Sequence, residues 1–166
     1  MKRTIFILLI LFSCCKEQSK AEGKIEEKIQ RTDFGLDFSD FAILKFNPEW
    51  HWIFENSKPS PADLKLNELS KIESILEKAI IEHNSELEND SRWKLELEGY
   101  NRQYVAILNE KGEKEVWINF FCDTGWTEDQ LKSYPYEVDD GGNCFFNIKI
   151  NLTTGSYGDL RINSIA

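Results

Sequence analysis

The sequence predicts an α+β domain in which one long helix packs on an antiparallel meander sheet of about five strands. Residues 145–152 alternate between apolar and mostly polar side chains, which is the pattern of a strand with one buried face. Phe146, Ile148 and Ile150 form that buried face. Apolar residues within 67–83 recur at steps of three and four, the pattern of a helix with one apolar stripe. The apolar runs after this helix are short and separated by turn sequences, so we expect antiparallel strands in series.

Length, composition and charge limit the kind of protein. The chain has 166 residues, of which 41% are hydrophobic and 13% aromatic, which suits one domain with a hydrophobic core and leaves little room for two. The formal net charge of −9 provides no basic footprint for nucleic acid. An acidic domain is also repelled by anionic membrane surfaces. We therefore expect a single α+β domain over residues 31–166 and no nucleic-acid partner.

Residues 1–13 have the organisation of a signal peptide. Lys2 and Arg3 provide a charged start, and an unbroken apolar run occupies residues 5–12. This run is far too short for a transmembrane helix, which needs about 20 residues. The segment is therefore expected to be a cleaved leader that takes no part in the fold.

The leader ends in LFSC (residues 11–14), which resembles the lipobox of bacterial lipoproteins. In that family the chain is cut before the cysteine, whose thiol is diacylated, and the new N-terminus is usually acylated too, for example with palmitate. The resemblance implies that Cys14 carries the lipid. It also implies an envelope protein held on a membrane, with the outer membrane as the expected site and a periplasmic or surface-facing domain. Phe12 is bulky for its position, Cys15 is a poorer competing acceptor, and an ordinary secretory signal is the alternative.

Residues 14–30 are expected to form the lipidated N-terminus and a flexible tether. The stretch KEQSKAEGKIEEKIQ (residues 16–30) is highly charged, with two isoleucines and no aromatic residue. Such a segment buries too little apolar surface to offset the entropy lost on ordering.

Aromatic residues are concentrated where the domain begins, within residues 31–54. Two short strands are expected there, at 43–46 and 50–54, because Pro48 interrupts a continuous one. The WHW motif (residues 50–52) is either a stacking platform for a sugar or a base, or ordinary core packing with one half-exposed indole.

The predicted helix, residues 67–83, has an apolar stripe that should cover the buried face of residues 145–152. Two N-caps fit the sequence: Ser60, which a proline follows, and Asn67, which precedes the periodic residues. Glu73 is assigned to the solvent face. The stripe comprises Leu69, Ile72, Leu76, Ala79 and Ile80, with Ile75 at its edge.

Strand and turn sequences alternate after the helix. The expected strands cover residues 93–98, 104–108, 116–122, 144–152 and 157–162. Residues 109–112 and 153–155 fit hairpin links that end in a left-handed glycine. Because no helical pattern separates these strands, the sequence predicts no strand–helix–strand crossover. The nearest analogous shape is the cystatin-like or nuclear-transport-factor-like roll.

Two stretches near the C-terminus, VWINFFC (residues 116–122) and DDGGNCFFNIKINL (residues 139–152), resemble small uncharacterised lipoproteins of the Bacteroidetes group. The likeness extends from about Trp52 to the end of the chain. It implies a location and a fold, but no activity that could be assigned to a residue.

The longest predicted loop, residues 123–143, is the candidate binding site, because long loops in compact domains are often functional. Its acids and aromatic rings suit a glycan or a protein partner, and calcium is the alternative that the DDGGN stretch raises without the EF-hand spacing. No cofactor or catalytic motif accompanies the loop, so we expect no cofactor. The candidate residues are Asp123, Trp126, Tyr134, Tyr136, Asp139 and Asp140.

Cys122 and Cys144 frame this loop. Outside the inner membrane the compartment is oxidising, so two remaining cysteines are expected to form a disulfide. Two buried free thiols are the alternative.

These features predict a lipid-anchored, non-enzymatic binding or interaction module of the cell envelope. The alternatives are a small envelope hydrolase that uses loop carboxylates, and a cystatin-like inhibitor or immunity protein. Two carboxylates facing each other about 5–10 Å apart in a cleft would favour the hydrolase. A flat acidic face with exposed aromatic residues would favour a protein partner.

Overall fold

The computed structural model describes residues 40–55, 58–89, 91–122, 125 and 127–165. The predicted signal peptide, Cys14 and the tether lie outside these residues. Within the described part of the chain, no helix is long and apolar enough to cross a membrane.

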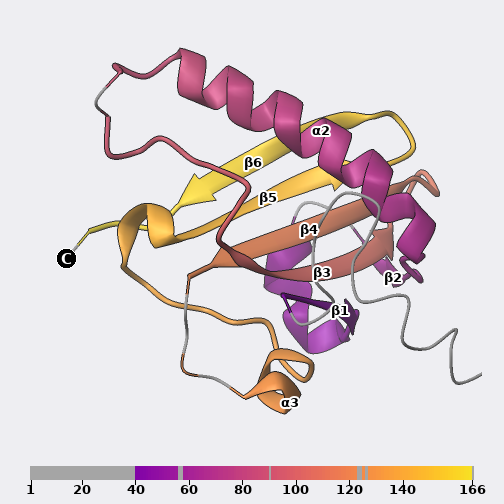
Figure 1. Ribbon diagram of the computed structural model, residues 1–166. Helices are drawn as coiled ribbons and strands as arrows, with labels where there is room; N and C mark the ends of the chain where they lie inside the picture. The colour runs from indigo at the N-terminus through magenta and orange to yellow at the C-terminus, as the bar shows by residue number, and fades with distance from the viewer. Residues whose placement is uncertain (1–39, 56–57, 90, 123–124, 126, 166) are drawn as a thin grey trace, which may run out of the picture.

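Six strands form one sheet, and the long helix α2 lies across one of its faces (Figure 1). The strand order is β1-β3-β4-β5-β6, with the short β2 pairing with β3 outside this path. In chain order, with η for a 3-10 helix, the elements are β1 (Phe41–Lys45), η1 (Pro48–Phe54), β2 (Ser60–Pro61), α2 (Leu66–Ser85), β3 (Asn101–Leu108), β4 (Lys114–Phe121), α3 (Glu128–Leu131), η2 (Gly142–Cys144), β5 (Phe145–Asn151) and β6 (Ser156–Ile162).

The predicted α+β class is confirmed, but the sheet is mixed. Strands β3 to β6 form the expected antiparallel meander. β1, in contrast, pairs with β3 in parallel. Because α2 lies between β1 and β3 in the chain, the three elements form a strand–helix–strand crossover, contrary to the prediction. Neighbouring parallel strands need a long connection of this kind, whereas antiparallel strands do not.

Helix α2 packs on the sheet as its periodicity predicted. The predicted stripe is buried, and Phe146, Ile148 and Ile150 lie in the same core with 1% exposure or less. The helix starts without either predicted cap, because Ser60 lies in β2 and Asn67 lies inside the helix. Instead, the Glu68 carboxylate accepts a hydrogen bond of 2.8 Å from the backbone N–H of the N-cap residue.

The opposite face of the sheet is partly covered by η1, where the sequence predicted a strand over residues 50–54. Asn47 caps this 3-10 helix by accepting a hydrogen bond of 3.1 Å from the backbone N–H of Glu49. Pro48 therefore starts a helical turn rather than interrupting a strand. Ile53 and Phe54 are buried against apolar residues of β3 and β4, which makes a second, smaller core.

Residues 93–98 form no strand, contrary to the prediction. The side-chain amide of Asn84 takes the place of a neighbouring strand: it accepts from the backbone N–H of Leu95 at 2.9 Å and donates to its carbonyl at 2.7 Å. Leu95 is 1% exposed. The segment is therefore extended and packs under the end of α2, which explains its alternating apolar and polar residues although it pairs with no strand.

Glu73 faces the sheet instead of the solvent, which corrects its predicted position. Its carboxylate lies 2.5 Å from the guanidinium of Arg102, whose side chain is 2% exposed. The same guanidinium donates to the Leu97 carbonyl at 2.6 Å and lies 4.9 Å from the Phe120 ring. Burying an unpaired charge costs roughly several kcal/mol, so Glu73 of α2 stabilises the buried guanidinium of Arg102 on β3.

The core beneath α2 can be tested with one matched pair of substitutions. Ile148→Ala should lower the free energy of unfolding by about 2–5 kcal/mol, because it leaves a cavity at a fully buried site. Ile81→Ala, on the exposed side of α2, should change it by less than about 0.5 kcal/mol. Urea denaturation of both variants measures the difference, and equal effects would contradict the strand register.

Candidate functional site

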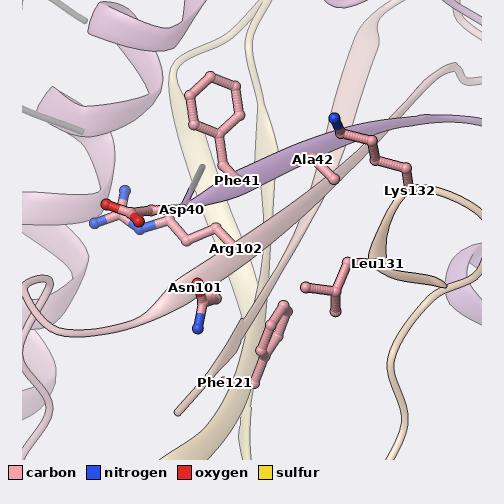
Figure 2. Close-up of a pocket in the computed structure, with 8 residues that line it drawn as sticks. All are labelled: Asp40, Phe41, Ala42, Asn101, Arg102, Phe121, Leu131 and Lys132. Atoms are coloured by element: carbon pink, nitrogen blue, oxygen red, sulfur yellow. The ribbon is translucent and has the colours of Figure 1, made fainter. Parts of the chain in front are cut away.

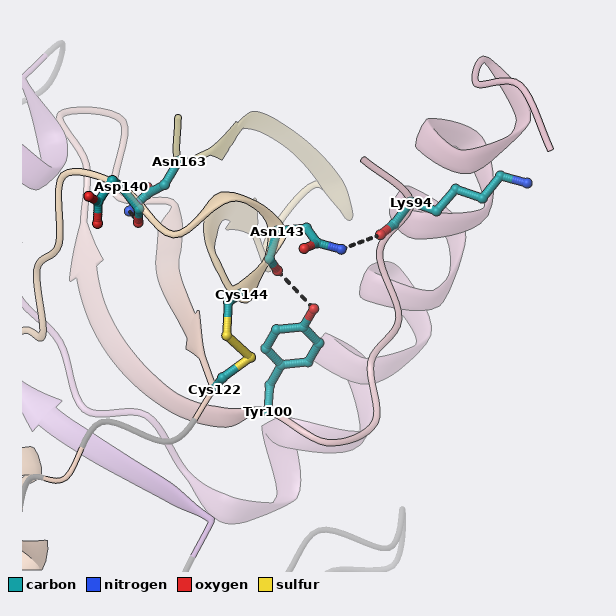
Figure 3. Close-up of a disulfide and its surroundings, with 7 residues drawn as sticks. All are labelled: Lys94, Tyr100, Cys122, Asp140, Asn143, Cys144 and Asn163. Carbon is teal, nitrogen blue, oxygen red and sulfur yellow. Dashed lines mark hydrogen bonds between the residues drawn. A yellow bond between two sulfur atoms is a disulfide. The ribbon is translucent and has the colours of Figure 1, made fainter. Parts of the chain in front are cut away.

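A disulfide closes the predicted binding loop at its base. Cys122 and Cys144 are joined, with a Cα–Cα distance of 5.3 Å, so the predicted pairing is confirmed (Figure 3). The backbone N–H of Cys122 also donates to the Cys144 carbonyl at 3.0 Å. On the chain-entropy account, closing a loop of this length stabilises the fold by roughly 3 kcal/mol.

Two side chains and one backbone carbonyl from other parts of the chain hold the C-terminal half of this loop (Figure 3). The Tyr100 hydroxyl donates to the carbonyl of Asn143 at 2.8 Å, and the Asn143 amide donates to the Lys94 carbonyl at 3.2 Å. On the other side, the Asn163 amide donates to the carbonyls of Val138 and Asp140.

Gly141 and Gly142, in the DDGGN stretch, make the turn that leads into η2. Both have positive φ, 94° and 60°, and a Cβ on Gly141 would lie 2.4 Å from the Phe145 ring. These glycines therefore serve the turn geometry. In the described residues, no group of three or more His, Cys, Asp or Glu side chains is placed to hold a metal ion.

Two buried amides on the sheet fix the path of the loop. Gln103 on β3 and Asn119 on β4 are opposite one another in register, and they are 0% and 7% exposed. The Gln103 amide donates to the carbonyls of Leu131 and Tyr134, each at 2.7 Å, and its oxygen accepts from the Tyr136 N–H at 2.6 Å. Asn119 donates to the Tyr136 carbonyl at 2.7 Å. Buried polar groups need partners, so these amides hold residues 131–136 across the sheet.

This arrangement leaves a depression between the loop and η1. Its volume is about 150 Å³, and it lies on the face of the sheet opposite α2. Pockets for drug-sized ligands measure about 300–1,000 Å³, so this one suits a single small ring or side chain. The lining residues are Trp52, Trp117, Asn119, Tyr136, Glu137, Val138, Asp139, Phe145, Asn147 and Asn163.

Aromatic rings form much of this depression. Trp52 of η1 is half-buried and meets Trp117 of β4 edge to face, with ring centroids 5.9 Å apart. Tyr136 and Phe145, also half-buried, have ring centroids 6.0 Å apart. Partly exposed rings on a rigid sheet can stack against a flat apolar surface of a ligand.

The polar side chains of the depression differ in whether they already form hydrogen bonds within the protein. The donors of Asn119 and Asn163 are bonded to loop carbonyls. The side chain of Asn147 makes no hydrogen bond within the described part of the chain. Because Asn147 lies opposite Asn119 in register, its amide is directed to the same face and can both donate and accept.

Two carboxylates lie at the rim of the depression. Glu137 and Asp139 are exposed, and neither side chain has a hydrogen-bonding or ion-pair partner among the described residues. Burial raises the pKa of Glu137, and the negative charge of Asp139 adds to this effect. The charge of Asp139 raises the pKa of Glu137 because the two carboxylates repel one another. No lysine or arginine lines the depression, so this negative charge is not compensated there.

The structure brings together only part of the predicted site. Tyr136 and Asp139 line the depression, whereas Tyr134 and Asp140 are exposed and do not line it. Asp123 and Trp126 lie outside the described residues. Trp52, from the WHW motif that the sequence left open, joins the loop residues at the same site.

Several residues of the site were not predicted from the sequence, above all Phe145 and Asn147. Both belong to the second face of the alternating strand, which the sequence analysis treated as solvent-facing. Their period-two spacing with Lys149 indicated that they share a face. It did not indicate that Trp52 and Tyr136 would enclose that face.

A second hollow, at the start of β1 and β3, is too small for a ligand. Its volume is about 10 Å³, about the space that one water needs. Figure 2 shows Arg102 and Asn101 at this hollow together with Phe121 and Leu131. The Arg102 Nε is buried without a hydrogen-bond partner there, and a single water fits that role.

A scan of protein-family models, a search of curated proteins and a search of solved structures find no match for this chain.

Replacing Gln103 tests whether the buried amides hold the loop. Gln103→Met keeps the volume but leaves the partners at residues 131, 134 and 136 unpaired, each at a cost of about 1–3 kcal/mol if it stays buried. We expect a lower free energy of unfolding and faster amide hydrogen exchange in residues 131–136, with α2 as the internal control. Unchanged exchange there would contradict the anchoring role.

Proposed function

We propose that this protein is a lipid-anchored, non-enzymatic binding module of the cell envelope, and that its depression binds a glycan. The observation that carries the proposal is the combination of half-buried rings with the unpaired amide of Asn147 in one small hollow. The hollow combines part of the predicted loop with part of the predicted aromatic platform, which supports treating them as one site.

A sugar matches the chemistry of this surface. The C–H face of a pyranose ring is apolar and flat and can lie against Trp52 or Tyr136. Its hydroxyl groups both donate and accept, as the amide of Asn147 does. A flat protein partner fits less well, because the aromatic side chains are gathered in a concave surface instead of spread over a face.

The location is proposed from the N-terminal sequence. The lipobox-like residues 11–14 and the charged tether supply an anchor and a spacer. The Cys122–Cys144 disulfide supports an oxidising compartment, because disulfides are rare in the reducing cytosol. Figure 1 shows one compact domain, which the tether would hold away from the membrane.

The hydrolase alternative is favoured by one observation, the pair formed by Glu137 and Asp139. A glycosidase uses one carboxyl group with a raised pKa and a second that is ionised, and burial raises the pKa of Glu137 beside Asp139. Both acids are exposed at the rim and are separated by a single residue in the chain, however, and do not face one another across a cleft. The inhibitor or immunity-protein alternative rests only on the analogy with the cystatin-like roll.

The binding proposal predicts different effects for two tryptophans of η1. Trp52→Ala should weaken glycan binding by at least about fivefold, because a well-placed ring pair contributes about 0.5–1.5 kcal/mol beyond its buried area. Trp50→Ala should leave binding unchanged, because Trp50 is in the same helix and core but does not line the depression. Isothermal titration of the full protein in detergent with tetramers of glucose and N-acetylglucosamine measures both.

Equal losses in the two tryptophan variants would contradict the assignment of the site. Mass spectrometry of the same tetramers after incubation distinguishes binding from hydrolysis. Shortened products that disappear with Glu137→Gln would establish the hydrolase instead.

The anchor has its own test. Cys14→Ser should abolish lipidation and shift the protein from the detergent phase to the aqueous phase, because Cys15 has a poorer upstream sequence. A single acyl chain binds membranes with an association constant of only about 10⁴ M⁻¹, so stable attachment needs the further chains that this processing adds. Phase partitioning with mass measurement of the N-terminal peptide reads the outcome. If the Cys14→Ser variant carries diacylglycerol on Cys15, the assignment of the lipidation site to Cys14 is wrong.

A further inference from the structure

We infer that the depression prefers an amino sugar, a glycan unit with a free and positively charged amine. The inference rests on the proposed glycan-binding function and specifies which class of glycan the site takes. It comes from the charge balance of the depression and its surroundings.

The lining of the depression carries negative charge and no positive charge. Of its ten residues, Glu137 and Asp139 are acids and none is lysine or arginine. Neither carboxylate has a partner among the described residues. By contrast, the carboxylate of the half-buried Glu68 is paired with Lys114 at 2.7 Å. The two acids at the depression are therefore available to a cation from outside.

Two cations, one on β5 and one on β6, share a single acidic partner. Lys149, two residues beyond Asn147 on the same face of β5, donates to the Asp159 carboxylate at 2.9 Å. This hydrogen bond lowers the pKa of Asp159, and the charge of Arg161 contributes. Arg161 is exposed and lies opposite Asn147 in register. Asp159 offsets one of these two positive charges, so the two cations and the three acids together leave one net negative charge, and the acids that line the depression itself have no cation beside them in its lining.

The rest of the depression distinguishes an amino sugar from a bare cation. A lysine side chain presents an ammonium group on a flexible alkyl stem and has no ring to stack and no hydroxyl groups to pair. A glucosamine unit offers a flat face for Trp52 or Tyr136, hydroxyl groups for Asn147, and an ammonium group for the acids. An ammonium group close to the aromatic rings also gains from the negative potential of their faces.

The experiment compares tetramers of equal length, using the full protein in detergent at low salt. The probes are the tetramers of glucosamine, N-acetylglucosamine and glucose, with tetralysine as a charge control. We expect glucosamine to bind about three- to tenfold more tightly than N-acetylglucosamine, because an exposed charge pair contributes only a small factor and two carboxylates are available to the ammonium group. The preference should shrink as salt is raised.

Two double variants show whether the rim acids cause the preference. Glu137→Gln with Asp139→Asn should bring glucosamine binding down to the level of N-acetylglucosamine. Glu77→Gln with Asp129→Asn removes the same number and kind of charges from exposed positions on α2 and α3, and should keep the preference.

The possible failures are distinguishable. Equal binding of glucosamine and N-acetylglucosamine overturns the amine preference and leaves the glycan proposal standing. Tetralysine that binds as tightly as glucosamine also overturns it, because the site would then respond to charge alone. If none of the three sugars binds, the proposed function fails, and the inference fails with it.

Discussion

The hydrogen bonding of two buried amides, Gln103 and Asn119, is the constraint on which the functional face depends. Both lie on central strands, where an unpaired amide would cost about 1–3 kcal/mol. The sheet pairs their backbones but not their side chains, and residues 131–136 supply the missing partners. The loop must therefore cross this face of the sheet. The depression between the loop and Trp52 is a consequence of that path.

The row of polar side chains across the sheet continues beyond these amides, and its members differ in role. Gln103, Asn119, Asn147 and Arg161 are successive partners in register on β3, β4, β5 and β6. The first two are buried and their amides donate to loop carbonyls, whereas the side chain of Asn147 has no partner among the described residues. The other face contrasts with this, because α2 closes it and pairs its buried arginine with Glu73. The unpaired amide of Asn147 thus lies on the open face, where a ligand can reach it.

Periodicity in the sequence correctly predicted the elements that pack against a single core along their whole length. The apolar stripe of α2 and the apolar side chains of residues 145–152 pack in one core, so apolar residues recur at regular intervals in both segments. Periodicity gave a wrong prediction at residues 93–98, where the side chain of Asn84, and not a neighbouring strand, forms hydrogen bonds with the backbone of Leu95. It failed again at Glu73, because helical spacing gives the direction of a side chain but not the buried arginine it meets.

The sequence alone was enough to predict the α+β class, the helix, five of the strands (the first of them to within two residues) and the pairing of Cys122 with Cys144. The elements depend on local periodicity and turn residues, which are properties of short segments, and the disulfide followed from the small number of cysteines in the chain. Only the tertiary structure decided that β1 is parallel to β3 and that Trp52 meets Tyr136 and Asn147 at one depression. These contacts join segments far apart in the chain. They follow from satisfying buried amides and closing a sheet edge, and no local pattern records which distant group will do so.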